Sequence, residues 1–127
     1  MYRFYNANAV GNFVNDCVVR AISAAECKSW DETYQELSEL AQKEGTLLDD
    51  VDFVEGYLDK HYKRVPHYSR TIGEFIEEYP KGTYLITVEG HITVVVEGIL
   101  FDTFDCRNRR IWGVWRVNKC HPNLQYK

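Results

Sequence analysis

The order of three residues in this chain favours catalysis by a thiol nucleophile. They are a cysteine, a histidine and an aspartate, at positions 17, 91 and 102. Cys17 begins an apolar segment at residues 18–25, and His91 begins a run rich in β-branched residues. Asp102 follows in the next β-rich segment. In sites of this kind a thiolate attacks the substrate, a histidine carries the proton and a carboxylate orients the histidine. The conjunction of the three residues predicts such a site.

The segment around Cys17 predicts a helix over residues 16–25. Its apolar side chains recur at helical spacing, at Val18, Ala21, Ile22 and Ala25. Asn15 or Asp16 can serve as the N-cap, which places Cys17 in the first turn. The partial positive charge and free N–H groups of a helix N-terminus lower the pKa of a thiol. The same N–H groups, with the side-chain amide of Asn15 or Asn12, are candidates for binding an oxyanion.

The carboxylate that would orient the histidine depends on the turn between two expected strands. A two-residue turn at residues 97–98 places His91 and Asp102 on the same face of the hairpin, as diagonal neighbours roughly 7 Å apart at the backbone. A three-residue loop would shift the register by one residue and bring Asp105 opposite His91 instead. Asp102 is therefore the expected third member of the site, and Asp105 is the alternative.

The remaining cysteines give no recognisable metal motif. The sequence has four cysteines, without Cys-x-x-Cys spacing. Cys27 falls near the end of the first helix and is interpreted as structural, while Cys106 shares the predicted face of His91. A zinc site of Cys106, Cys120 and His121 would lack a fourth obvious ligand and the short paired spacings of zinc loops. We therefore expect no metal and no cofactor.

The elements that would position these residues divide into helices followed by strands. Two N-caps, Ser29 and Thr71, each have a glutamate three residues later. Together with the apolar periodicity, they predict helices at residues 16–25, 29–44, 49–62 and 71–79. Runs of β-branched and aromatic residues predict strands at residues 84–88, 91–96, 99–104 and 111–117. The expected fold class is α+β, with N-terminal helices packed on a C-terminal antiparallel β-meander.

Length, charge and composition predict an ordinary globular protein. Residues 1–127 are expected to form one domain. Acidic and basic residues are mixed along the chain, with a formal net charge of -4, which argues against nucleic-acid binding. No apolar signal segment opens the sequence, and no stretch approaches the roughly eighteen apolar residues of a membrane span. We therefore expect a cytoplasmic protein with neither a membrane nor a nucleic-acid partner.

The segments around the candidate residues resemble the papain-like cysteine peptidase superfamily. The resemblance rests on three short motifs, at residues 15–22, 90–98 and 101–106. More narrowly, the chain is similar to small bacteriocin-processing peptidases and to phage proteins with an Asn-Asp-Cys-Val-Val-Arg-Ala-Ile opening. Residues 17–22 also resemble the Cys-Leu-Phe-Arg-Ala helix of ovarian-tumour-type deubiquitinases, although Val14 stands where that family has an acidic residue.

The resemblance implies a papain-like fold and a Cys-His-Asp triad that cleaves a peptide, isopeptide or related amide bond in a peptide or protein substrate. Gly11 stands where papain has a glutamine, so the oxyanion would be bound by Asn15, Asn12 or the backbone. The third member of the site in papain is an asparagine. Asp102 would replace it here, as an aspartate does in bacteriocin-type relatives.

Two other functions are compatible with the same residues. An acyl transferase of the transglutaminase or acetyltransferase type would pass the acyl group from Cys17 to an amine instead of water. A catalytically inert papain-like module, such as a phage protein that binds a host factor, would keep the fold without the reaction. A phage-encoded protein would act in the host cytoplasm.

Overall fold

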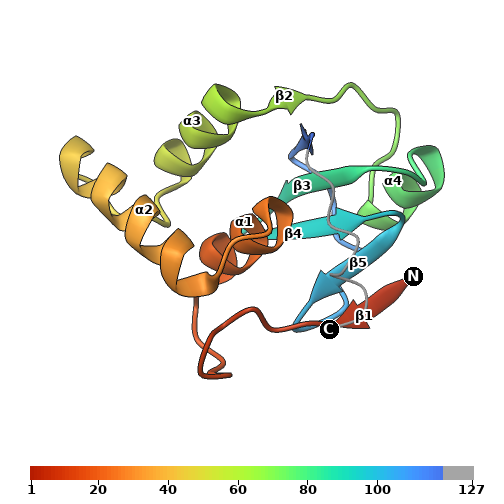
Figure 1. The fold of residues 1–127 in the computed structure, drawn as a ribbon. Helices are drawn as coiled ribbons and strands as arrows, with labels where there is room; N and C mark the ends of the chain where they lie inside the picture. Colours follow the sequence, from red (N-terminus) through yellow and green to blue (C-terminus); the bar gives the residue numbers. More distant parts are fainter. Residues whose placement is uncertain (119–127) are drawn as a thin grey trace.

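The structure, a computed structural model, describes residues 1–118. These residues form four helices and one six-stranded mixed sheet, so the expected α+β class is confirmed (Figure 1). The helices are α1 (Cys17–Glu26), α2 (Trp30–Glu44), α3 (Val51–His61) and α4 (Ile72–Glu78). The strands are β1 (Tyr2–Phe4), β2 (Lys63–Arg64), β3 (Thr83–Val88), β4 (His91–Val96), β5 (Ile99–Asp102) and β6 (Gly113–Val117).

Polar side chains cap three of these four helices. Ser29 and Asp50 each accept a hydrogen bond from the backbone N–H three residues later, at the starts of α2 and α3. Thr71 and Glu74 form a reciprocal capping box at the start of α4. Such caps satisfy N–H groups that have no partner inside the helix. The helix predicted from residue 49 therefore begins later, at Val51, because Asp50 is its cap.

The hairpin of β4 and β5 has the turn that the sequence predicted. Val96 pairs with Ile99, and the two residues between them, Glu97 and Gly98, have φ angles of 50° and 76°. Positive φ at both positions suits a hairpin turn whose twist matches that of its strands. This turn sets the register of β5 against β4.

The expected antiparallel meander is only partly correct. Strands β3, β4 and β5 do follow one another, but the sheet order is β1-β5-β4-β3-β6-β2. β1 pairs in parallel with β5, with Tyr2 beside Leu100. β1 occupies the edge of β5 that faces away from β4. β6 pairs instead with the edge of β3 that faces away from β4. β1 and β2 have three and two residues, too few to show the alternation that predicts a strand.

Two expected strands are shorter than predicted. The strand expected at residues 99–104 ends at Asp102. There the backbone N–H of Thr103 donates to the Asp102 carboxylate at 2.7 Å, so it makes a local turn instead of continuing the ladder. The strand expected at residues 111–117 begins at Gly113.

Helices cover both faces of the sheet, and alternate strand residues contact them (Figure 1). One face packs against α1, α2 and α3 through side chains that include Leu85 and Val94. The opposite face packs against α4 through side chains that include Ile86 and Val95. Helix α1 contacts β4 directly, which fixes its N-terminus relative to the start of that strand. Of the helices within residues 1–118, none has the length and apolar character that crossing a bilayer requires.

Candidate active site

Cys17 is the first residue of α1, and its thiol is free and partly exposed. Asp16 occupies the N-cap position, but its side chain makes no capping hydrogen bond. Of the two predicted N-caps, Asn15 is therefore not the cap, and Asp16 holds the position without performing the usual role. The N–H groups of the first turn are thus not bound by the N-cap carboxylate, which suits the binding of an anion formed at Cys17.

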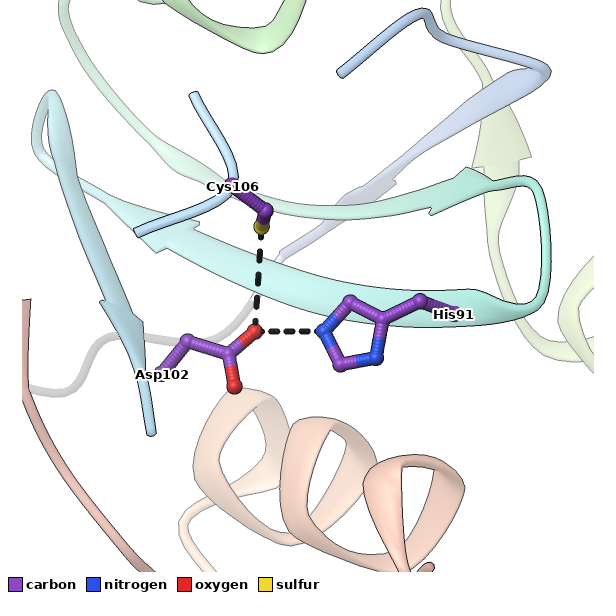
Figure 2. A group of neighbouring side chains, drawn as sticks. All are labelled: His91, Asp102 and Cys106. Carbon is purple, nitrogen blue, oxygen red and sulfur yellow. Dashed lines mark hydrogen bonds and ion pairs between the residues drawn. The ribbon is translucent and has the colours of Figure 1, made fainter. Parts of the chain in front are cut away.

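His91 and Asp102 form a buried pair at the adjacent ends of β4 and β5. The Nε2 atom of His91 lies 2.7 Å from Oδ2 of Asp102, and the two side chains are 7% and 2% exposed. Figure 2 shows the imidazole edge directed at the carboxylate. The alternative carboxylate, Asp105, is exposed and pairs with Arg107 at 2.8 Å. The geometry therefore joins Asp102, and not Asp105, to the histidine.

Cys17 and His91 line the same two hollows, and each of them shifts the pKa of the other. Burial alone would raise the pKa of Cys17, but hydrogen bonds from His91 and from the Ile92 N–H lower it below the ordinary value. Burial alone would lower the pKa of His91, but its hydrogen bonds, first of all to Asp102, raise it to about 11. Because Asp102 binds Nε2, the Nδ1 atom is the ring nitrogen left for the thiol. The site favours a thiolate beside an imidazolium.

Arg20 joins the carboxylate of the site to the residue before the cysteine. Its Nη1 donates to Oδ1 of Asp102 at 2.9 Å, and its Nε donates to Oδ1 of Asp16 at 2.7 Å. Asp16 also accepts from Nδ2 of Asn8 at 3.2 Å and from Nε1 of Trp30 at 2.9 Å. These bonds explain why Asp16 does not cap α1, since its oxygens face Arg20, Asn8 and Trp30 instead.

Sequence reasoning missed Arg20, although two signals could have found it. Arg20 lies four residues after Asp16, the spacing at which opposite charges meet on a helix. It also lies among the buried side chains of α1, where a charge must be paired. The positive charge of Arg20 helps to lower the pKa of Cys17, and its hydrogen bond helps to lower the pKa of Asp102 against the effect of burial.

A second thiol, that of Cys106, lies beside the Asp102 carboxylate. Cys106 is buried, with only 1% of the residue exposed. Its Sγ donates to the same Oδ2 that His91 contacts, at 3.9 Å (Figure 2). Cys106, which was expected to share the face of His91, lies close to it. A thiol, an imidazole and a carboxylate are also ligands for zinc, and these three ligand atoms lie within 4.8 Å of one another.

The contacts of Asp102 favour a hydrogen-bonded site over a cation site. Both carboxylate oxygens already accept hydrogen bonds, and the guanidinium of Arg20 lies 2.9 Å from Oδ1, where it opposes a metal ion. The zinc alternative that combines Cys106 with Cys120 and His121 involves two residues outside the described part of the chain. The absence of a metal remains a prediction.

Two hollows flank Cys17 and His91, and both residues line each of them. The first hollow, about 140 Å³, lies between α1, α3 and the turn that joins β3 to β4. The second, about 290 Å³, lies between the loop before α1 and the segment after β5. Asn15 lines both hollows, and Asn12 lines the second. Which of these amides binds an oxyanion remains a prediction.

Cys27 lies outside this network. It is the C-cap of α1, with a left-handed backbone (φ 59°) and an exposed side chain.

Comparisons of the chain with protein-family models, with curated proteins and with solved structures found no match. The chemistry of the site is therefore inferred from its own residues and their geometry.

Proposed function

We propose that this protein is a papain-like thiol hydrolase that cleaves a peptide, isopeptide or related amide bond. The observation that carries the proposal is the placement of His91, which lines the same two hollows as Cys17 while its Nε2 lies 2.7 Å from Oδ2 of Asp102. A partly exposed thiol at a helix N-terminus, beside a held imidazole, is the arrangement that nucleophilic thiol catalysis requires.

The reaction would proceed through an acyl-enzyme. The Cys17 thiolate attacks the carbonyl carbon, and the resulting oxyanion binds to the Cys17 N–H with the Asn15 amide as second donor. His91 gives its proton to the leaving amine as the C–N bond breaks, which leaves a thioester on Cys17. Water then attacks the thioester, His91 takes a proton from it, and the released thiolate and carboxylic acid restore the site.

Asp102 and Arg20 support the proposal without touching the substrate. Asp102 fixes the orientation of the His91 ring and stabilises its protonated form. Arg20 binds the other oxygen of Asp102 and so restricts the rotation of this carboxylate. Arg20 and Asp102 are positioning residues in this scheme, and Cys17 and His91 are the catalytic ones.

The proposal is tested by trapping the acyl-enzyme. The full chain is incubated with a panel of peptide thioesters and fluorogenic peptide amides, and its intact mass and products are followed. We expect an acyl adduct on Cys17 that turns over to the free acid, no turnover in Cys17→Ala, and wild-type turnover in the matched control Cys27→Ala.

Other outcomes would point to the alternative functions. Products that carry an added amine, when an amine is present, would replace the hydrolase with an acyl transferase. Turnover that survives Cys17→Ala would contradict any thiol mechanism. The absence of every adduct on Cys17, with folding intact, would favour an inert binding module.

A further inference from the structure

The first hollow has the size of a single side chain and lies directly beside the candidate nucleophile. Its volume is about 140 Å³, and Cys17 and His91 are among its lining residues. Pockets for drug-sized ligands enclose roughly 300–1,000 Å³, whereas an apolar cavity of about 150 Å³ accommodates a molecule such as benzene. A substrate held at Cys17 would place one of its side chains here.

The inner wall of the first hollow is apolar. The wall is formed by the buried side chains of Val18, Val54, Val88 and Ile92. Contact with these groups favours a side chain with a chain of methylene groups, because burying methylene groups away from water is favourable. The wall therefore selects an aliphatic stem and not a short polar side chain.

The mouth of the first hollow is acidic. Asp49 and Glu55 line it, and no lysine or arginine of residues 1–118 does. Asp49 is exposed, and Glu55 is 37% exposed with its Oε1 3.8 Å from Nη2 of Arg64. That long, solvated contact neutralises Glu55 weakly. Two carboxylates at the mouth favour a cation at the end of the stem.

An exposed tryptophan adds a second reason for a cation. Trp112 lines the first hollow and is 55% exposed, so its indole is accessible to a group bound there. The face of an indole attracts ammonium and guanidinium groups within about 6 Å. The second hollow differs, because Arg20 lines it and no carboxylate of residues 1–118 does. A cationic group is thus favoured on one side of Cys17 only.

We infer that the first hollow binds a lysine- or arginine-type side chain of the substrate, with its stem on the apolar wall and its cation between Asp49, Glu55 and Trp112. This inference rests on the proposed function, since it assumes that a substrate is acylated at Cys17. It goes beyond that function by naming the side chain that selects the cleavage site.

The test compares two side chains that differ by one charge. Peptidyl acyloxymethyl ketones alkylate a reactive cysteine without requiring water or turnover. Pairs of these probes carry either lysine or norleucine, which has the same stem without the ammonium group, at one of the two positions nearest the ketone. Intact mass gives the rate at which each probe modifies Cys17 of the full chain.

At one position we expect the lysine probe to react at least about tenfold faster than the norleucine probe, a ratio that corresponds to about 1.4 kcal/mol. The double variant Asp49→Asn, Glu55→Gln should reduce this ratio to below about twofold, because the charges that favour the ammonium are gone. The matched control Glu77→Gln removes an exposed carboxylate from a separate surface hollow and should keep the wild-type ratio.

Equal rates for lysine and norleucine at both positions, with Cys17 still modified, would overturn the inference and leave the proposed function intact. A lysine preference that persists in the double variant would also overturn it. If neither the probes nor iodoacetamide modify Cys17 selectively, the proposed function fails and the inference falls with it.

Discussion

Two thiols lie near the His91–Asp102 pair, and they differ in exposure and in their position relative to a helix. Cys17 is partly exposed, begins a helix and lines two hollows. Cys106 is 1% exposed and follows β5 in an irregular segment. Both thiols lie near the histidine, so nearness to His91 alone does not distinguish them. Access and a helix N-terminus distinguish Cys17.

The buried thiol of Cys106 contacts the carboxylate of Asp102. Cys106 donates a weak hydrogen bond to the Oδ2 atom that also contacts His91. Together with Arg20 and the Thr103 N–H on the other oxygen, it surrounds the carboxylate of Asp102 with donors. Each donor favours the charged carboxylate, so burial does not neutralise it. Cys17 is the thiol that we propose to react, whereas the contact that Cys106 makes is with the carboxylate of Asp102.

The largest expected effect is the difference in alkylation between the two thiols. Iodoacetamide should label Cys17 at least about ten-thousandfold faster than Cys106, because Cys106 reacts only after local opening that costs several kcal/mol. Peptide mass spectrometry after timed labelling of the native protein measures both rates. Similar rates at the two cysteines would show that burial does not separate them.

The second expected effect is the difference in stability between variants of Asp102, the last residue of β5, and of Asp105, three residues later. Asp102→Ala should lower the free energy of unfolding by about 3–5 kcal/mol, because it leaves the buried charge of Arg20 and the His91 ring without this acceptor. Asp105→Ala removes an exposed ion pair with Arg107 and should cost about 0–1 kcal/mol. Urea unfolding followed by fluorescence measures both. Equal losses would reject the assignment of Asp102 to the network.

The third expected effect is on the pH dependence of stability. The raised pKa of His91 contributes stability that is complete below its usual value of about 6.5 and is lost as the pH rises towards 11. The lowered pKa of Cys17 acts in the opposite sense: its contribution is complete above about 8.5 and is lost as the pH falls. Between about pH 6.5 and about pH 8.5, the stability contributed by His91 therefore falls as the pH rises, while the stability contributed by Cys17 grows.

Removing the thiol should therefore expose the effect of the histidine. From about pH 6.5 to about pH 8.5, Cys17→Ala should lose up to about 1.4 kcal/mol of unfolding free energy per pH unit relative to the wild type. Urea titrations at a series of pH values provide the comparison, with Cys27→Ala as the matched control. Parallel pH profiles for wild type and Cys17→Ala would show that folding does not lower the pKa of Cys17.

The smallest expected effect is on the rate of labelling of Cys17. His91→Gln removes a hydrogen bond and a positive charge, so the pKa of the thiol should rise and the thiolate fraction at about pH 6 should fall about tenfold. Timed iodoacetamide labelling provides the rate, and Cys27 in the same molecule is the internal control. An unchanged rate at Cys17 would mean that His91 does not activate it.

The local features of the site could be predicted from the sequence because short-range patterns determine them. The apolar spacing after Cys17 and the two-residue turn at Glu97 and Gly98 depend on neighbouring residues alone. That turn was sufficient to place His91 and Asp102 on one face. The N-caps Ser29 and Thr71 were recognised in the same way.

The features that were missed depend on contacts between distant parts of the chain. The parallel pairing of β1 with β5 joins residues about a hundred positions apart, and three residues give no strand signal. Arg20 reaches Asp102 across 82 positions. The side chain of Asp16 turned from its helix because Asn8, Arg20 and Trp30 bind it. Tertiary contacts determine each of these three features and override the local preference of the sequence.

The position of β5 between β1 and β4 also has a consequence for the order in which the protein matures. During synthesis the ribosome produces Cys17 long before Asp102, and β5 can pair on both edges only when its own residues have emerged. Such long-range strand pairing is slow compared with helix formation. A nascent chain therefore carries the Cys17 thiol before His91 and Asp102 have been made, and any effect of this pair on the thiol begins only once β4 and β5 have paired.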